Sequence, residues 1–248
     1  ILNASRAHKA TAIALKTRTY LSKGDYAKVV SEASKIVPQS APFQYVSGSL
    51  THRLEPNIAT VFGGLYVGSE AIFTIPFTTA AEAPGLQSAL GPNYLTPVLY
   101  FNSAGIIAND VFASPTSTDA RKALVITNST GQKLLNKFKK NSAPFTDFVP
   151  VIRYAEIILN YAEAAAQNNN LPLARTLLSA VRNRSDAAYV FTTGVTTKDE
   201  LIATILTERR IELVGEGFRT PDLLRRVQTL PGKTGNAGVA PEVLPTAG

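Results

Sequence analysis

The sequence has 248 residues, of which 45% are hydrophobic and 17% are charged, so it is long enough to bury a substantial core. Cysteine is absent, which excludes a disulfide framework, a thiolate metal site and a cysteine nucleophile. The formal net charge of +7 would suit an anionic glycan, a nucleic acid or a membrane surface, but no run of five like charges occurs, and a scattered solvated surface explains the charge better. No stretch reaches the roughly 18 apolar residues of a membrane-spanning helix.

Two helices are predicted within residues 5–37. Small and apolar residues recur at helical spacing over residues 5–21, and a second helix over residues 26–37 follows the break at Gly24-Asp25. This pattern resembles a tetratricopeptide helix pair. One such pair cannot bury its own apolar face, so further helices are expected to cover it.

Residues 38–150 have a different composition, rich in Pro, Gly, Ser, Thr and aromatic residues. Residues 71–77 predict a short strand because apolar and β-branched residues dominate them, and residues 133–139 predict either a strand or a short helix. The remainder is expected to form long loops with short helices. Long loops in a compact domain usually bind something or lack a fixed structure.

Residues 151–230 predict a second helical block. One helix is expected over residues 153–167, and after three asparagines a second begins near Pro172, a residue well suited to an early helical position. A third helix is expected from Thr197, which forms a capping-box pattern with Glu200.

A short helix over residues 221–228 and an irregular tail over residues 231–248 complete the chain. The predicted fold is therefore one mostly α domain, in which tetratricopeptide-like helix pairs pack together and a loop-rich insert carries short strands.

Two of the predicted helices carry charge on a face that should be buried. Glu156, Asn160 and Glu163 share one helix face, and Glu208, Glu212 and Glu216 share another. Paired carboxylates could act in acid–base catalysis or hold a metal, although a helix-bundle metal site also needs histidine. The two histidines lie elsewhere, and His52 with Glu55 supplies at most half of a metal site.

We therefore predict a structural network of salt bridges, because a buried charge without a partner costs several kcal/mol. We predict no catalytic residue, no metal site and no cofactor. The expected members of the network are Arg153, Glu156, Glu163, Glu208, Arg209, Glu212 and Arg219.

The order of these motifs resembles the SusD/RagB family. The resemblance is strongest over residues 153–226, between Arg-Tyr-Ala-Glu at the start of one helix and Arg-Arg near the end of the last. It is weaker at residues 6–37, and weaker still at Ser69-Glu70-Ala71, Asp119-Ala120-Arg121 and Lys137-Phe138. Family members are usually about twice this long, and many have Trp where this chain has Thr220-Pro221.

The resemblance implies a non-enzymatic nutrient-binding protein on the extracellular face of an outer membrane. Such a protein would bind a glycan or oligosaccharide and deliver it to a SusC-like TonB-dependent transporter, against which the tetratricopeptide-like face packs. It would contact the membrane only through a lipid anchor upstream of Ile1, and it would not bind nucleic acid.

Ligand contacts are expected in the insert. The apolar C–H faces of sugars stack on aromatic rings, and Asn93, Tyr94 and Tyr100 lie in or beside a Pro/Gly/Asn-rich stretch that is not expected to form a core strand. We predict these three residues as ligand contacts. The alternative is that Tyr100 and Phe101 anchor the insert on the helices. The absence of Trp removes the strongest stacking platform, which leaves weak glycan affinity or a different ligand open.

Two other functions stay open at this point. A tetratricopeptide-type adaptor would bind a protein in a helical groove, but it should show three or more regular repeats, whereas more than 100 residues separate these helix pairs. An all-α glycan-cleaving enzyme would need two carboxylates that face an open cleft. That hypothesis fails if Glu156 and Glu212 are both buried against arginines.

Overall fold

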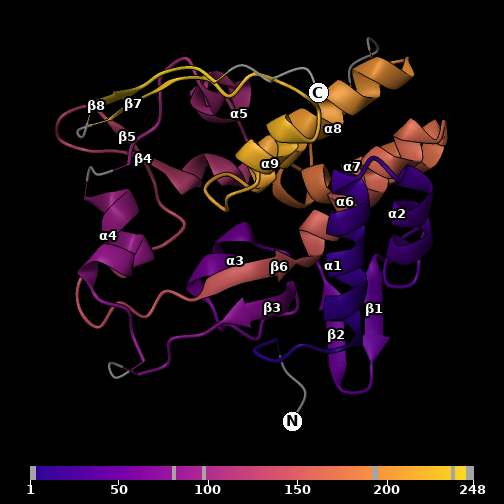
Figure 1. Cartoon of the computed structure of the whole chain (residues 1–248), viewed down its shortest axis with the longest axis horizontal. Coiled ribbons are helices and arrows are strands. Elements are labelled where there is room, and N and C mark those ends of the chain that lie inside the picture. Colours follow the sequence, from indigo (N-terminus) through magenta and orange to yellow (C-terminus); the bar gives the residue numbers. More distant parts are fainter. Residues whose placement is uncertain (1–3, 80–81, 97–98, 192–194, 236–237, 244–248) are drawn as a thin grey trace.

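The computed structural model describes residues 4–79, 82–96, 99–191, 195–235 and 238–243. Most of the longer helices gather on one side of the molecule, and most of the short elements of the insert gather on the other (Figure 1). No helix within these residues is long and apolar enough to cross a membrane. The α-helices are α1 (Lys9–Ser22), α2 (Tyr26–Ala33), α3 (Ile58–Gly63), α4 (Leu90–Leu95), α5 (Asp110–Ala113), α6 (Tyr154–Gln167), α7 (Leu171–Ser185), α8 (Lys198–Glu212) and α9 (Arg219–Leu224).

Within the described residues, the strands are short and pair in twos, as antiparallel sheets. The described part of the insert also contains the short 3₁₀ helices η1 (Leu86–Ser88), η2 (Ile106–Ala108) and η3 (Ala120–Leu124). The strands are β1 (Gln44–Ser47), β2 (Leu50–Arg53), β3 (Ala71–Ile75), β4 (Val125–Thr127), β5 (Lys133–Leu135), β6 (Val149–Arg153), β7 (Lys233–Gly235) and β8 (Gly238–Ala240).

Helices α1 and α2 form the predicted pair. The turn between them needs Gly24, whose φ of +70° lies in the left-handed region, and the side chain of Asp25 then caps α2 by accepting a hydrogen bond from the Lys28 backbone N–H. Helix α1 begins at Lys9, later than the predicted residue 5, because His8 and Thr11 form a capping box there. Helix α2 ends at Ala33 instead of residue 37, and a turn follows it.

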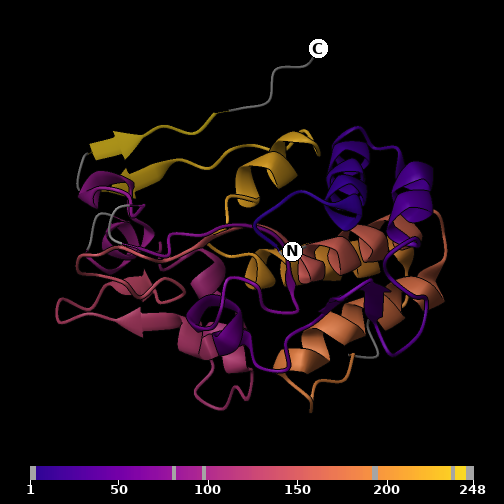
Figure 2. The same cartoon turned by 90° about the horizontal axis from the view of Figure 1, so that it is seen from below.

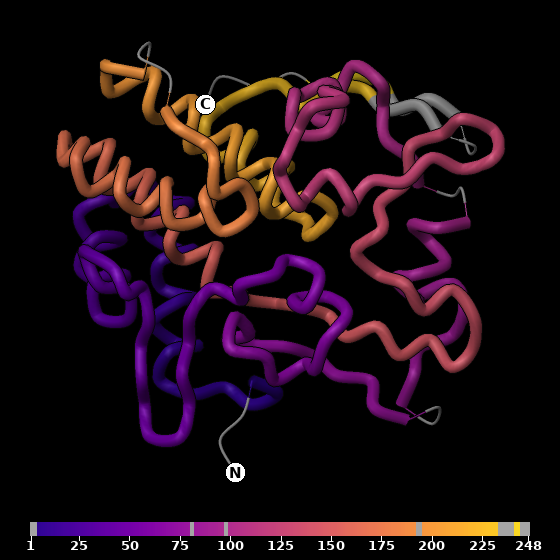
Figure 3. Tube along the Cα trace, turned by 180° about the vertical axis from the view of Figure 1, so that it is seen from behind, coloured from indigo at the N-terminus to yellow at the C-terminus, as the bar shows by residue number. Residues whose placement is uncertain are grey.

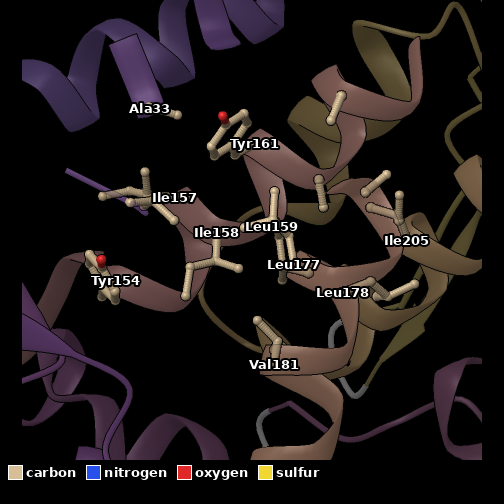
Figure 4. Close-up of a cluster of buried hydrophobic side chains, with 14 of the residues drawn as sticks. Ala33, Tyr154, Ile157, Ile158, Leu159, Tyr161, Leu177, Leu178, Val181 and Ile205 are labelled. Carbon is tan, nitrogen blue, oxygen red and sulfur yellow. The ribbon is translucent and has the colours of Figure 1, made fainter. Parts of the chain in front are cut away.

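Helix α6 is the centre of the helical block. Every residue from Tyr154 to Ala166 is buried, because α1, α2, α7 and α8 all pack against this helix. A helix that is covered all round needs apolar residues on every side. Ile158 and Leu159 lie beside Leu177 of α7, and Ile157 lies on the opposite side of α6, toward Ala33 of α2 (Figure 4).

The insert is tied to the helices by the β3–β6 sheet. Ala71 pairs with Arg153 and Ile75 pairs with Val149, and β6 continues directly into α6. The tube in Figure 3 follows residues 38–150 away from the helices and back along this strand. The predicted strand over residues 71–77 thus ends at Ile75, before Pro76, and residues 133–139 supply strand β5 instead of a helix.

The insert also has an apolar cluster of its own. Phe62 of α3 and Phe138 pack edge to face at 5.9 Å between ring centroids. Ile211 near the end of α8 and Val214 just after this helix complete the cluster. Seen from below, strands β4 and β5 of the insert (pink) lie at one end of the molecule, and helices α6 and α7 (salmon and orange) lie toward the other end (Figure 2). The predicted fold class, mostly α with helix pairs and a loop-rich insert that carries short strands, is confirmed.

Candidate functional site

A buried cluster of charges holds the insert against the helices. The carboxylate of Glu212, at the end of α8, accepts hydrogen bonds from Arg121 at 3.1 Å, Arg153 at 3.0 Å and Arg184 at 2.6 Å. Burial alone would raise the pKa of Glu212, but the charges of the three arginines outweigh burial and lower this pKa well below its usual range. Glu212 therefore stays ionised at neutral pH and links η3, β6 and α7 at one point.

The cluster continues along β6. Arg153 also contacts Glu70, and its Nε lies 2.7 Å from Glu216. Lys137 donates to the other oxygen of Glu216 at 2.7 Å and to the backbone carbonyl of Glu212 at 2.8 Å. Each of these groups is nearly or fully buried, so the ion pairs are screened very little by solvent.

A second cluster fixes α9 to α6 and α8. Arg225 donates to both oxygens of Glu163 at 2.6 and 2.7 Å, and it also contacts Asp222 at 2.9 Å. Arg209 of α8 bridges Asp222 at 2.7 Å and the side-chain oxygen of Asn160 at 2.6 Å. The polar face of α6 is thereby satisfied from two neighbouring helices.

The structure places the residues of the predicted salt-bridge network as follows. Arg153, Glu163, Arg209 and Glu212 lie in the two clusters, Glu208 contacts Arg121 and Arg182, and Glu156 pairs with Arg18 at 2.7 Å. Arg219 differs, because it is exposed and forms no ion pair with the part of the chain that the structure describes.

Several partners were missed as members of this network. Glu70, Arg121 and Lys137 come from the three short motifs that carried the weakest family resemblance, so that resemblance was the one signal that could have found them. Arg225 belongs to the Arg-Arg motif that ends the stretch of strongest resemblance, whereas Arg18 and Arg184 lie in none of the motifs that carried it.

Neither of the two carboxylates considered for catalysis faces an open cleft. Glu156 is buried against Arg18, and Glu212 is buried against three arginines. Within the described residues, no group of His, Cys, Asp and Glu side chains could hold a metal ion.

A cleft of about 610 Å³ opens between the insert and the α8–α9 region. This volume lies in the range of small-molecule sites. The insert contributes Tyr94 and Phe101 to its lining. Among the described residues, the α8–α9 region contributes an aromatic ring, four arginines and a single acid: Phe218, Arg209, Arg210, Arg219, Arg226 and Asp222.

Tyr94 forms part of the wall that the insert contributes. Its hydroxyl donates a hydrogen bond to the carbonyl of Gly215, and its ring stacks on Phe138 at 5.7 Å between centroids. Burial raises the pKa of Tyr94, and the charge of Glu216 raises it further, so the hydroxyl keeps its proton and remains a donor. Gly215 has a φ of +77°, and a Cβ atom there would lie 2.1 Å from Leu135 Cδ2.

The other two predicted ligand contacts are placed differently. The side-chain amide of Asn93 donates to the backbone carbonyls of Ala89 at 2.7 Å and Gln87 at 3.2 Å. Tyr100 is half-buried and does not line the cleft, whereas its neighbour Phe101 does. Phe101 also packs against the apolar cluster of the insert.

Comparison with known proteins places these observations in a family. The model of the SusD family matches residues 93–240. A SusD superfamily protein from Bacteroides fragilis has a similar structure, with a TM-score of 0.79 and 26% identity over 99% of this chain and 53% of that one. Surface glycan-binding protein A from Bacteroides uniformis has a TM-score of 0.63 at 21% identity, over 89% of this chain and 50% of that one.

A curated relative, SusD-like protein P38 from Formosa agariphila, is 35% identical over 100 residues, which cover 37% of this chain and 20% of P38. The chain thus spans about half the length of the solved structures above, and its match to this relative covers a fifth of that protein. The family predicted from the sequence motifs is confirmed: the chain belongs to the SusD family.

Proposed function

We propose that this chain belongs to a nutrient-binding protein of the cell surface, which holds a glycan or oligosaccharide and passes it, uncleaved, to a SusC-like TonB-dependent outer-membrane transporter. The observation that carries the proposal is the 610 Å³ cleft with aromatic walls between the insert and α8–α9. Membership of the SusD family supports it, as does the shared fold of a protein described as a surface glycan-binding protein.

The chemistry of the cleft suits a saccharide. Tyr94 and Phe101 offer aromatic surface for the C–H faces of a sugar, and the arginines opposite supply hydrogen-bond donors for hydroxyl oxygens. The ring of Phe218 is already contacted by the guanidinium groups of Arg18 and Arg209, each 5.1 Å from its centroid. Stacking of a sugar therefore falls mainly to the wall formed by the insert.

The cleft is also held in place before any ligand arrives. The hydrogen bond from Tyr94 to Gly215 and the ion pair between Arg209 and Asp222 fix its two sides. A preorganised site spends less free energy on ordering side chains when the ligand binds.

Binding without cleavage is supported by the acid content of the cleft. Glycoside hydrolysis by the usual route needs two carboxylates on either side of the bond. Asp222 is the single acidic residue among the described residues that line the cleft, and it is paired with Arg209 and Arg225.

The remaining parts of the proposal concern location and partner. We propose that a lipid anchor upstream of this sequence holds the protein on the extracellular face of the outer membrane. The face formed by α1 and α2 is proposed to pack against the transporter. An adaptor would instead use a groove along successive helix pairs, whereas the cleft lies at the junction of the insert with α8 and α9.

The test is calorimetric titration of the chain with a panel of oligosaccharides. Tyr94→Ala and Phe101→Ala are expected to weaken binding at least tenfold, and Tyr66→Ala, which changes a tyrosine outside the cleft, is the matched control. Circular dichroism of each variant separates lost binding from lost folding. An equal loss in the Tyr66 variant would contradict this location for the site, and the absence of any binding would contradict the proposed function of this chain.

A further inference from the structure

We infer that the cleft selects an acidic saccharide, whose carboxylate or sulfate group is held by Arg210 and Arg219. The inference rests on the proposed function and names the class of ligand for the same site. It starts from the charge of the cleft, whose lining contains four arginines and one acid among the described residues.

Two of the four arginines are already engaged by the protein. Arg209 is paired with Asp222 and hydrogen-bonded to Asn160, and Arg226 lies 3.8 Å from a carboxylate oxygen of Glu163. The positive charge of these two arginines is therefore at least partly balanced.

Arg210 and Arg219 are not balanced in this way. Neither forms an ion pair or a side-chain hydrogen bond with any residue that the structure describes, and both line the cleft. Arg210 is half-buried, so water hydrates its guanidinium group less fully than that of an exposed arginine. Burial lowers the pKa of Arg210, and the like charge of Arg219, which lines the same cleft, lowers it further.

Among the described residues, the arginines that are buried around α6 and α8 meet carboxylates, as Arg121, Arg153, Arg184 and Arg225 do. Two neighbouring guanidinium groups without a carboxylate are a configuration that an oxyanion would stabilise, because a guanidinium donates two parallel hydrogen bonds to a carboxylate or sulfate.

The opposite wall indicates what carries the anion. Tyr94, Phe101 and Ile106 form an apolar surface on the side of the insert, facing the arginines of α8 and α9. A ligand with an apolar ring face and an acidic substituent matches both walls at once. Acidic sugars have this chemistry, whether the anion is the carboxylate of a uronic acid or a sulfate ester.

The experiment titrates the chain with four probes: a galacturonic acid hexasaccharide, a κ-carrageenan hexasaccharide, neutral maltohexaose and hexaglutamate. We expect one of the two acidic saccharides to bind more tightly than maltohexaose and hexaglutamate, and the one that binds identifies the anion as carboxylate or sulfate. Arg210→Gln and Arg219→Gln should each weaken that binding at least tenfold. Arg53→Gln is the matched control, because Arg53 is an exposed arginine outside the cleft.

Each contrary outcome has a distinct meaning. Maltohexaose binding as tightly as the acidic saccharides, without change in the Arg210 variant, would overturn the inference and leave the proposed function standing. Hexaglutamate binding as tightly as the acidic saccharides would overturn it in favour of an acidic protein segment. Equal loss in the Arg53 variant would show attraction to overall charge only and would overturn it too. No binding of any saccharide would contradict both.

Discussion

The hydroxyl of Tyr94 donates a 3.0 Å hydrogen bond to the backbone carbonyl of Gly215, 121 positions further along the chain. This contact joins helix α4 of the insert to the segment that follows α8. Because Tyr94 also lines the cleft, the same side chain supports the wall and presents its surface to a ligand.

The two roles of Tyr94 can be separated by substitution. Tyr94→Phe keeps the ring and removes only the hydrogen bond, so it should lower the free energy of unfolding by about 1 kcal/mol and leave saccharide affinity nearly unchanged. Tyr94→Ala should lower both. Urea unfolding and calorimetric titration of the same samples measure the two effects, and a large loss of affinity in the phenylalanine variant would assign the hydroxyl to the ligand.

The glycines at the end of α8 offer a matched pair. Gly215 and Gly217 both have positive φ, of +77° and +84°, but an added Cβ meets Leu135 only at Gly215 and open space at Gly217. Gly217→Ala should cost about 1 kcal/mol from backbone strain alone. Gly215→Ala should cost about 1–3 kcal/mol more from overpacking. Equal unfolding free energies for the two variants would show that Leu135 moves away freely.

The pair formed by Glu163 and Arg225 is expected to be important for stability. Glu163→Gln removes the carboxylate that Arg225 contacts through both oxygens and leaves Asp222 as the remaining acidic partner of Arg225, so it should lower the free energy of unfolding by about 3 kcal/mol. The more exposed pair between Lys35 and Glu32 is the control. Lys35→Gln should change the free energy of unfolding by less than about 1 kcal/mol. Thermal unfolding of both variants gives the comparison. A small effect of Glu163→Gln would mean that α9 is held mainly by Arg209 and Asp222.

The stability of the protein should fall in mild acid because of His52. This side chain is buried, stacked on His8 at 5.2 Å between ring centroids, and lies near Tyr45. Burial, together with the charge of His8, lowers the pKa of His52 to about 4. Its unfolded pKa is about 6.5, so the unfolded chain takes up a proton first as the pH falls.

Neutral His52 therefore makes its full contribution to the free energy of unfolding above about pH 6.5. This contribution is lost progressively as the pH falls from about 6.5 to about 4, by at most about 1.4 kcal/mol per pH unit. His52→Phe keeps a stacked ring without a titrating group, so its unfolding free energy should depend less on pH in this window. Urea unfolding at several pH values measures this, and identical pH profiles for wild type and variant would contradict the assignment.

The helices were predictable because their signals are local. The capping box of Thr197 and Glu200 does start α8, and the charged faces of α6 and α8 do turn into the interior. The stretch around Pro92 was expected not to form a core strand, and it forms the short helix α4, in which proline is tolerated within the first turn.

The cleft and the partners of the buried carboxylates were not predictable from local pattern. Arg18 meets Glu156 across 138 positions, and only tertiary packing decides which arginine reaches which acid. Arg219 could be mistaken for a member of the network because it follows the same helix. Its lack of a partner, which carries the inference on acidic sugars, becomes visible only once the acids nearby are seen to pair with other residues.

The three hydrogen bonds to Glu212 span 91, 59 and 28 positions of the chain. Such distant contacts form late, after the intervening chain has given up its freedom, so folding should be slow relative to a simple helical bundle. The bond from Arg121 also crosses the boundary between the insert and the helices, as does the ion pair of Lys137 with Glu216. Neither part keeps its buried charges balanced without the other, so the two are expected to unfold in one cooperative transition, and a shortened chain that omits residues 38–150 would lose the helical block as well.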